Sequence, residues 1–109
     1  MTLKRAKQKT AVEKVIKRFV ELASEIPEVQ LVLYEEESTG TRSIVTIIDA
    51  PRFEDSYWYK VFEAERVALE GVSETPVEFH VSNAREANQS LDYYVRDDHR
   101  VLFRRGAIP

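Results

Sequence analysis

The chain has 109 residues, of which 43% are apolar and 32% charged, so it suits one globular domain with its own core and is not typical of a disordered protein. It has no cysteine, which excludes disulfides, thiolate nucleophiles and cysteine-based zinc sites. No segment has the roughly 18 apolar residues of a membrane span, and the net charge is −3, so we expect a cytoplasmic protein that does not contact membranes.

The N-terminal segment is strongly basic. Residues 1–18 carry seven basic side chains and one acidic one, a net charge of +6, which leaves −9 for the remainder. The basic residues at its start are Lys4, Arg5, Lys7 and Lys9. We interpret residues 1–9 as a flexible, solvated arm. Contact of these four side chains with nucleic acid is the alternative, although the acidic remainder argues against a broad nucleic-acid surface.

The first predicted helix runs to about Ile26. Apolar residues recur from Val12 onward at steps of three and four, which indicates one face of an amphipathic helix. Thr10 and Glu13 fit a capping box at its start. Pro27 ends it, because the residue before a proline is disfavoured in the helical region.

Two strands follow, at residues 29–34 and 43–49. Both are apolar on two faces, which is typical of strands covered on both sides. Thr39-Gly40 is the natural reversal point, because glycine tolerates positive φ, so we expect an antiparallel hairpin. The three glutamates at residues 35–37 alternate between faces of the strand. We interpret them as a solvated strand end, not as a metal site.

The second predicted helix begins at Asp55 or Ser56 and ends near Gly71. Its apolar stripe consists of Trp58, Val61, Phe62, Ala68, Leu69 and Val72. Three consecutive aromatic residues cannot all face one core, so we expect Tyr57 and Tyr59 at the flanks or the surface. Exposed tyrosines often anchor protein interfaces, which makes both interaction candidates. The alternative is that they cover a small core.

The third strand is predicted at residues 77–81 by its alternation. Glu78 and His80 share its polar face, and together with Asp49 at the end of the second strand they are weak candidates for acid–base catalysis. The alternative is that half-buried strands simply carry polar residues there. His99 lies in a turn, where we expect it to be exposed.

A third helix is predicted from residue 83, where Asn83 and Glu86 fit a capping box. Its apolar residues are Ala87, Leu91, Tyr94 and Val95. Tyr93 lies off this stripe and is the third interaction candidate. Residues 100–105 form a possible short edge strand with charged ends.

The element order is therefore helix, strand, strand, helix, strand, helix and a C-terminal strand. A strand–helix–strand unit favours a parallel, right-handed crossover between the second and third strands. We predict an α+β fold with a small mixed sheet packed against helices, as one domain over residues 1–109.

This order, with the strand that ends at Leu33-Tyr34, the strand SIVTIID and the strand PVEFHV, resembles the minimal nucleotidyltransferase domain from about residue 12 to 105. In that family a Gly-Ser at the end of the first strand cradles nucleotide phosphates. An Asp-x-Asp at the start of the second strand, often with a carboxylate on the third, holds the divalent metals of phosphoryl transfer.

The sequence departs from this pattern at the catalytic positions. Glu35 and Glu36 stand where the resemblance puts Gly-Ser, and Ser43 and Val45 stand where it puts the two aspartates. Glu78 alone matches a carboxylate position. The resemblance therefore implies a non-catalytic, degenerate member with no metal or cofactor. It would act through a partner protein or a second copy. A small enzyme using Glu78, His80 and Asp49, or a nucleic-acid-binding module, are the alternatives.

Overall fold

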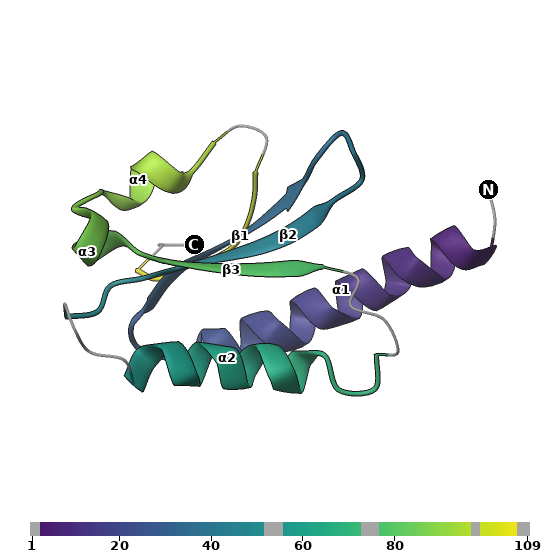
Figure 1. The fold of residues 1–109 in the computed structure, drawn as a ribbon, viewed down its shortest axis with the longest axis horizontal. Helices are drawn as coiled ribbons and strands as arrows, with labels where there is room; N and C mark the ends of the chain where they lie inside the picture. The colour runs from purple at the N-terminus through teal and green to yellow at the C-terminus, as the bar shows by residue number, and fades with distance from the viewer. Residues whose placement is uncertain (1–2, 52–55, 73–76, 97–98, 107–109) are drawn as a thin grey trace.

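A computed structural model describes residues 3–51, 56–72, 77–96 and 99–106, with side chains from residue 10 onward except at positions 56 and 57. Its elements are α1 (Leu3–Ala23), β1 (Val29–Glu36), β2 (Arg42–Ile48), α2 (Ser56–Ala68), β3 (Glu78–Asn83), α3 (Ala84–Ala87), α4 (Leu91–Tyr94) and β4 (Arg100–Arg104) (Figure 1). None of the helices described is long and apolar enough to cross a membrane.

The strands described form one mixed sheet in the order β3-β2-β1-β4. The β1–β2 hairpin is antiparallel and β2 pairs with β3 in parallel, as the sequence predicts. The expected C-terminal strand is also present, as β4 at the edge antiparallel to β1. Gly40 reverses the hairpin with a φ of 92°, the positive value for which glycine is suited. The α+β class and the mixed sheet predicted from the sequence are confirmed.

Both faces of the sheet are covered, which confirms the interpretation of the two apolar strands. One face packs against α1 and α2, where Phe19, Ile44 and Val61 are fully buried in one cluster. The other carries a smaller cluster, which includes Leu31 and Ala84 and lies under α3 and α4. Figure 1 shows the two long helices on one side of the sheet and the two short ones on the other. The strand alternation thus divides the core into two parts.

The first helix is longer than the sequence pattern predicts. It begins at Leu3, so Thr10 lies inside the helix and does not cap it, and residues 3–9 of the segment interpreted as an arm belong to α1. Residues 3–9 contain no glycine or proline and consist of leucine, lysine, arginine, alanine and glutamine, which are strong helix formers. The apolar stripe marks only the part of α1 that packs on the sheet.

The predicted third helix is in fact two helices of four residues. Asn88 adopts the left-handed conformation, with φ 55° and ψ 45°, and ends α3. Asparagine visits this region more readily than other non-glycine residues. The Asn83 half of the predicted capping box is confirmed, because the Asn83 side chain accepts a hydrogen bond from the Arg85 N–H at 3.2 Å. It also holds the Ala50 backbone through both N–H and C=O, which joins the ends of β2 and β3.

The end of β4 is tied to the connection between α1 and β1 by Arg105. Its guanidinium donates hydrogen bonds to the carbonyl oxygens of Ser24 and Ile26, both at 2.9 Å, and to that of Val29 at 2.8 Å. The charged group also lies 5.1 Å from the centre of the Phe103 ring. The edge strand is therefore attached to the body by more than its ladder to β1.

Candidate functional site

At the hairpin end of the sheet, three strands place polar residues in one row. Glu35 of β1 pairs with Ser43 of β2, which pairs in turn with Glu78 of β3. Residues directly opposite one another point to the same face, and with strands about 4.8 Å apart the outer two Cα atoms are about 10 Å apart. This row lies where the resemblance puts the metal-binding carboxylates.

The side chains of this row do not offer a metal site. Ser43 is buried, and Val45 packs against the cluster beneath α3 and α4. Glu78 is exposed, and its carboxylate lies 3.3 Å from His80 Nε2. Among the residues described, no group of three or more histidines, aspartates or glutamates is arranged to hold a metal ion.

Two of the glutamates at the mouth of the hairpin, Glu35 and Glu36, have side-chain partners. The Glu36 carboxylate lies 3.9 Å from Arg42 across the hairpin and 3.5 Å from the Tyr34 hydroxyl. Burial, followed by the nearby Glu36 charge, raises the pKa of Tyr34. The Glu35 carboxylate lies 3.5 Å from His99 Nε2. Both glutamates therefore link parts of the sheet rather than stand free in solvent.

The position of His99 differs from the sequence expectation of an exposed turn residue. Its side chain is only 9% exposed. It lies between Glu35 and the Tyr94 carbonyl oxygen, which is 3.1 Å from Nδ1. No local pattern predicts this contact, because β1 and the residues before β4 meet only when the sheet is assembled.

The candidate acid–base residues do not all meet. His80 pairs with Val45, whereas Asp49 follows Ile48, which pairs with Asn83. Asp49 therefore lies four residues farther along the strand, about 13 Å at 3.3 Å per residue. It forms an ion pair with Arg85 at 2.6 Å instead. The structure brings Glu78 and His80 together and places Asp49 elsewhere.

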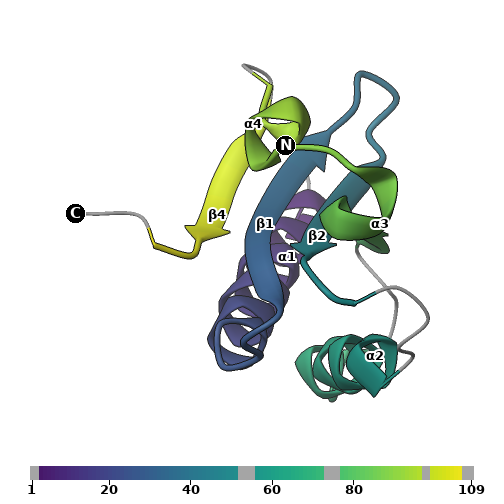
Figure 2. The same cartoon turned by 90° about the vertical axis from the view of Figure 1, so that its left-hand side faces the viewer.

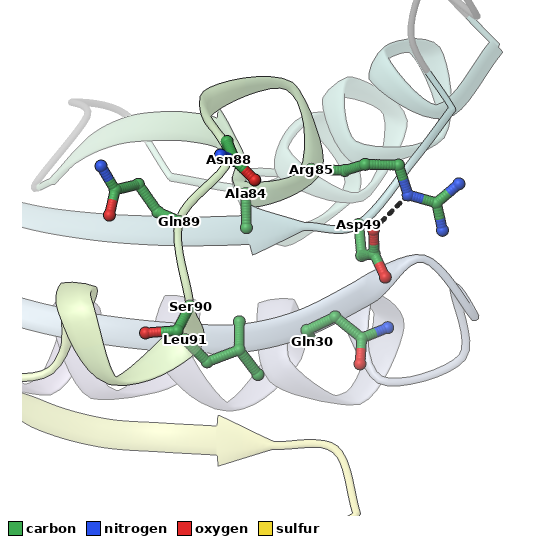
Figure 3. A pocket seen from close by; sticks show the side chains of 8 residues that line it. All are labelled: Gln30, Asp49, Ala84, Arg85, Asn88, Gln89, Ser90 and Leu91. Carbon is green, nitrogen blue, oxygen red and sulfur yellow. Dashed lines mark hydrogen bonds and ion pairs between the residues drawn. The ribbon is translucent and has the colours of Figure 1, made fainter.

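A hollow of about 460 Å³ lies at the end of β2, between α3 and α4 (Figure 3). Its lining residues are Gln30, Asp49, Ala84, Arg85, Asn88, Gln89, Ser90 and Leu91. The strand ends of an α/β sheet are common ligand sites. The acid and the base in this lining pair with each other, however, and the remaining polar groups are amides and one hydroxyl. This lining can form hydrogen bonds but does not favour a ligand of either charge.

The outer side of α2 exposes two large aromatic side chains. Tyr59 is 71% exposed and Phe62 is 52% exposed. Trp58 is partly buried, and its ring centre lies 6.5 Å from that of Phe62. We call these three residues the α2 aromatic surface. The exposure predicted for Tyr59 is confirmed.

The core position predicted for Phe62 is wrong. The buried stripe of α2 consists of Val61, Ala64 and Ala68, which turns Phe62 away from the sheet. Ala64 was not counted in the predicted stripe, although its spacing of three from Val61 and four from Ala68 fits a helix face. The helical spacing of Ala64 and Ala68 with Val61 is the signal that places Phe62 outside the core.

Tyr93, another interaction candidate, lies apart from this surface. Tyr93 of α4 is 58% exposed and meets the Tyr94 ring edge-on, with ring centres 5.2 Å apart. Tyr57 lies in α2, and its side chain is outside the described ones. The same holds for the basic side chains of the first turns of α1, which are Lys4, Arg5, Lys7 and Lys9. Their contact with nucleic acid stays a prediction.

One ionisable group beside the sheet is strongly perturbed. Burial raises the pKa of Glu65, on the flank of α2, to about 7, and the nearby His80 partly opposes this shift. Glu65 and His80 therefore lie close enough to interact electrostatically, although they belong to different layers.

The comparisons with known proteins add no relative. No family model, no curated protein and no solved structure matches this chain. The geometry of the described residues is therefore what supports a function.

Proposed function

We propose that this chain is a non-catalytic nucleotidyltransferase-like domain that acts by binding protein through the α2 aromatic surface. The observation that carries the proposal is the exposure of Tyr59 and Phe62, 71% and 52%, on one turn of a helix. Apolar side chains exposed side by side are a common mark of a binding surface. Aromatic residues of this kind dominate the binding energy of protein interfaces.

The nucleotidyltransferase-like part of the proposal is supported by the element order and the mixed sheet. Its non-catalytic part is supported by the residues at the catalytic positions. Phosphoryl transfer through two metals needs several carboxylate oxygens around the ions. Ser43 is buried and Val45 is apolar, so neither position supplies one. At the phosphate position, Glu35 and Glu36 would repel a triphosphate.

Calorimetric titration with ATP and magnesium tests the non-catalytic part. We expect no binding heat. Micromolar affinity would contradict the proposal, and loss of that affinity in Glu78→Gln, but not in Asp49→Asn, would place the nucleotide at the polar row. Asp49 lies six residues along the strand from Ser43, the partner of Glu78, a distance of about 20 Å, which makes its variant a matched control.

Site-specific photo-crosslinking in cells tests the protein-contact part. A photoreactive amino acid at position 62 should give discrete protein crosslinks, because this position lies on the proposed surface. The same amino acid at position 93, which is similarly exposed on another element, is the matched control. The absence of discrete crosslinks at position 62, or identical products at both positions, would refute binding through α2.

A further inference from the structure

We propose that the outer edge of β3 binds an extended, basic segment of a partner protein, which adds a strand to the sheet beside β3. This edge is a different surface from the α2 aromatic surface, so binding there does not depend on Tyr59 or Phe62. The backbone of β3 determines the shape of the partner segment, and the charges around β3 determine its chemistry.

The outer edge of β3 is unpaired. β3 is the last strand in the order β3-β2-β1-β4 and pairs with β2 on one side. Figure 2 shows β4 on one side of β1 and β2 on the other, with α2 beyond β2. Within the part of the chain that the structure describes, no other segment pairs with β3 through its backbone. An edge strand turns backbone N–H and C=O groups outward, and an extended chain can pair with them.

The two edges of the sheet differ in how well they are protected. β4 has five residues, begins and ends with arginine, and shifts its register against β1 between Val32 and Leu33. Short strands, charged ends and register irregularities all hinder the pairing of an edge with another chain. β3 pairs with β2 over six residues without a shift and contains no proline, glycine, lysine or arginine. β3 therefore offers a regular ladder that β4 does not.

The surroundings of the β3 edge are acidic on both faces of the sheet. Glu78 and His80 lie on the face of α3 and α4, because His80 pairs with Val45 of that cluster, and both side chains are more than half exposed. Glu65 of α2 lies on the other face, close enough to His80 to interact electrostatically. Among the described residues, no side chain forms a hydrogen bond or a salt bridge with the Glu65 carboxyl group.

These carboxyl groups select a basic segment. A lysine or arginine on an added strand can lie directly beside Glu78, at the distance of a cross-strand pair. Burial raises the pKa of Glu65 to about 7, and a cationic side chain nearby favours its ionised form. A second copy of β3 would bring its own Glu65 and Glu78 and add like charges to the edge. A basic strand from another protein is therefore the better partner.

Fluorescence polarisation of the full chain with a labelled eight-residue peptide that alternates lysine and valine tests this proposal. We expect a dissociation constant on the order of 100 μM, because the backbone hydrogen bonds and ion pairs must offset the ordering of the peptide. A peptide with proline at two central valine positions keeps the charge but cannot pair regularly, and should bind at least about tenfold more weakly. A peptide that alternates glutamate and valine should bind as weakly.

Variants of the chain test the charge. Glu78→Lys should weaken the lysine peptide at least about fivefold, because an attractive cross-strand pair becomes a repulsive one. Glu21→Lys is the matched control, since Glu21 is exposed on α1 and the change in net charge is the same. It should change the affinity by less than about twofold. Circular dichroism shows whether both variants are folded.

Amide hydrogen exchange measured by NMR locates the bound peptide. We expect additional protection in β3, because the added strand occupies its outward N–H groups. The proposal is overturned if no peptide binds at about 1 mM protein, or if the proline or glutamate peptide binds as tightly as the lysine peptide. Equal weakening by Glu21→Lys and Glu78→Lys, or protection in β4 and not in β3, would also overturn it. None of these results bears on crosslinking from position 62, so the two surfaces are tested separately.

Discussion

Arg105 offers the sharpest test of how the sheet edge is held. Its guanidinium serves three backbone carbonyls that close the turn after α1, and it stacks on Phe103. A hydrogen bond from a charged donor contributes about 1.5 kcal/mol or more, and a cation–π contact about 0.5–1 kcal/mol. Because one partly exposed group makes all these contacts, the gains are not additive. We expect Arg105→Ala to lower the free energy of unfolding by about 3 kcal/mol.

A second variant of Arg105 separates the effect of the planar guanidinium from the effect of its charge, and a variant of Arg104 is the control. Arg105→Lys keeps the charge, but an ammonium cannot reach three carbonyls as a planar guanidinium does, so we expect a loss of about 1.5–2 kcal/mol. Arg104→Ala is the matched control. The neighbouring Arg104 forms one ion pair with the exposed Asp92 at 2.9 Å, which predicts a change of about 0.5 kcal/mol or less.

Urea unfolding followed by Trp58 fluorescence and by circular dichroism measures all three variants. A loss of about 3 kcal/mol is a large part of the roughly 5–15 kcal/mol expected for a small domain, so the midpoint should move clearly. The reasoning is refuted if the free energies of unfolding of Arg105→Ala and Arg104→Ala differ by less than about 0.5 kcal/mol. Water would then hydrogen-bond the three carbonyls as well as Arg105 does.

Three further predictions concern other parts of the chain. The pKa of Glu65, about 7 in the folded chain against 4.5 ordinarily, means that the folded state holds its proton more tightly. The stability that this proton provides is complete below about pH 4.5 and is lost as the pH rises through about 7. We expect the free energy of unfolding in urea to fall by about 1 kcal/mol over this range, after allowance for the half-exposed position of Glu65. In Glu65→Gln this fall should be absent. If the slope between about pH 5 and 8 is the same in the variant, the assignment to Glu65 is wrong. Asn88→Gly should leave the melting temperature nearly unchanged, whereas Asn88→Ala should lower the stability by about 1 kcal/mol, because the position has a φ of 55°. Equal melting temperatures of the two variants would show that alanine adopts this conformation without a free-energy cost. In gel-shift assays at low salt, removal of residues 1–9 should cause no loss of nucleic-acid binding, and a salt-sensitive shift that only the full chain shows would favour the nucleic-acid alternative.

Local patterns predicted the sheet well, because strand pairing follows from local chemistry. The backbone of a strand sends successive side chains to opposite faces, so two strands that are apolar on both faces indicate a covered sheet, and Gly40 indicates where the hairpin turns. A helix between two strands requires a crossover, which the parallel pairing of β2 and β3 confirms. Each of these features depends on neighbours within a few residues or on a general rule of topology.

The features that sequence reasoning missed are partly local and partly set by contacts between distant segments. Phe62 was placed in the core because it is large and apolar, although the smaller Ala64 completes the buried stripe. Asn88 divides the third helix because its left-handed conformation ends α3, and a helical pattern of apolar residues does not reveal that break. The roles of His99 and Arg105 depend on partners that only the folded sheet brings near.

The hairpin mouth shows why the search for function moves to α2. A phosphate-cradling loop needs backbone N–H groups that point to the ligand and no negative charge beside them. Here the Glu37 N–H donates to the Thr41 carbonyl at 2.8 Å and the Gly40 N–H to the Glu37 carbonyl at 2.9 Å, so these donors serve the turn itself. Glu35 and Glu36 point to opposite faces, and each has a partner from a different segment, His99 and Arg42. A triphosphate at this end would have to break those contacts and approach two carboxylates. A partner that covers the exposed aromatic residues of α2, in contrast, removes apolar surface from water, which is energetically favourable.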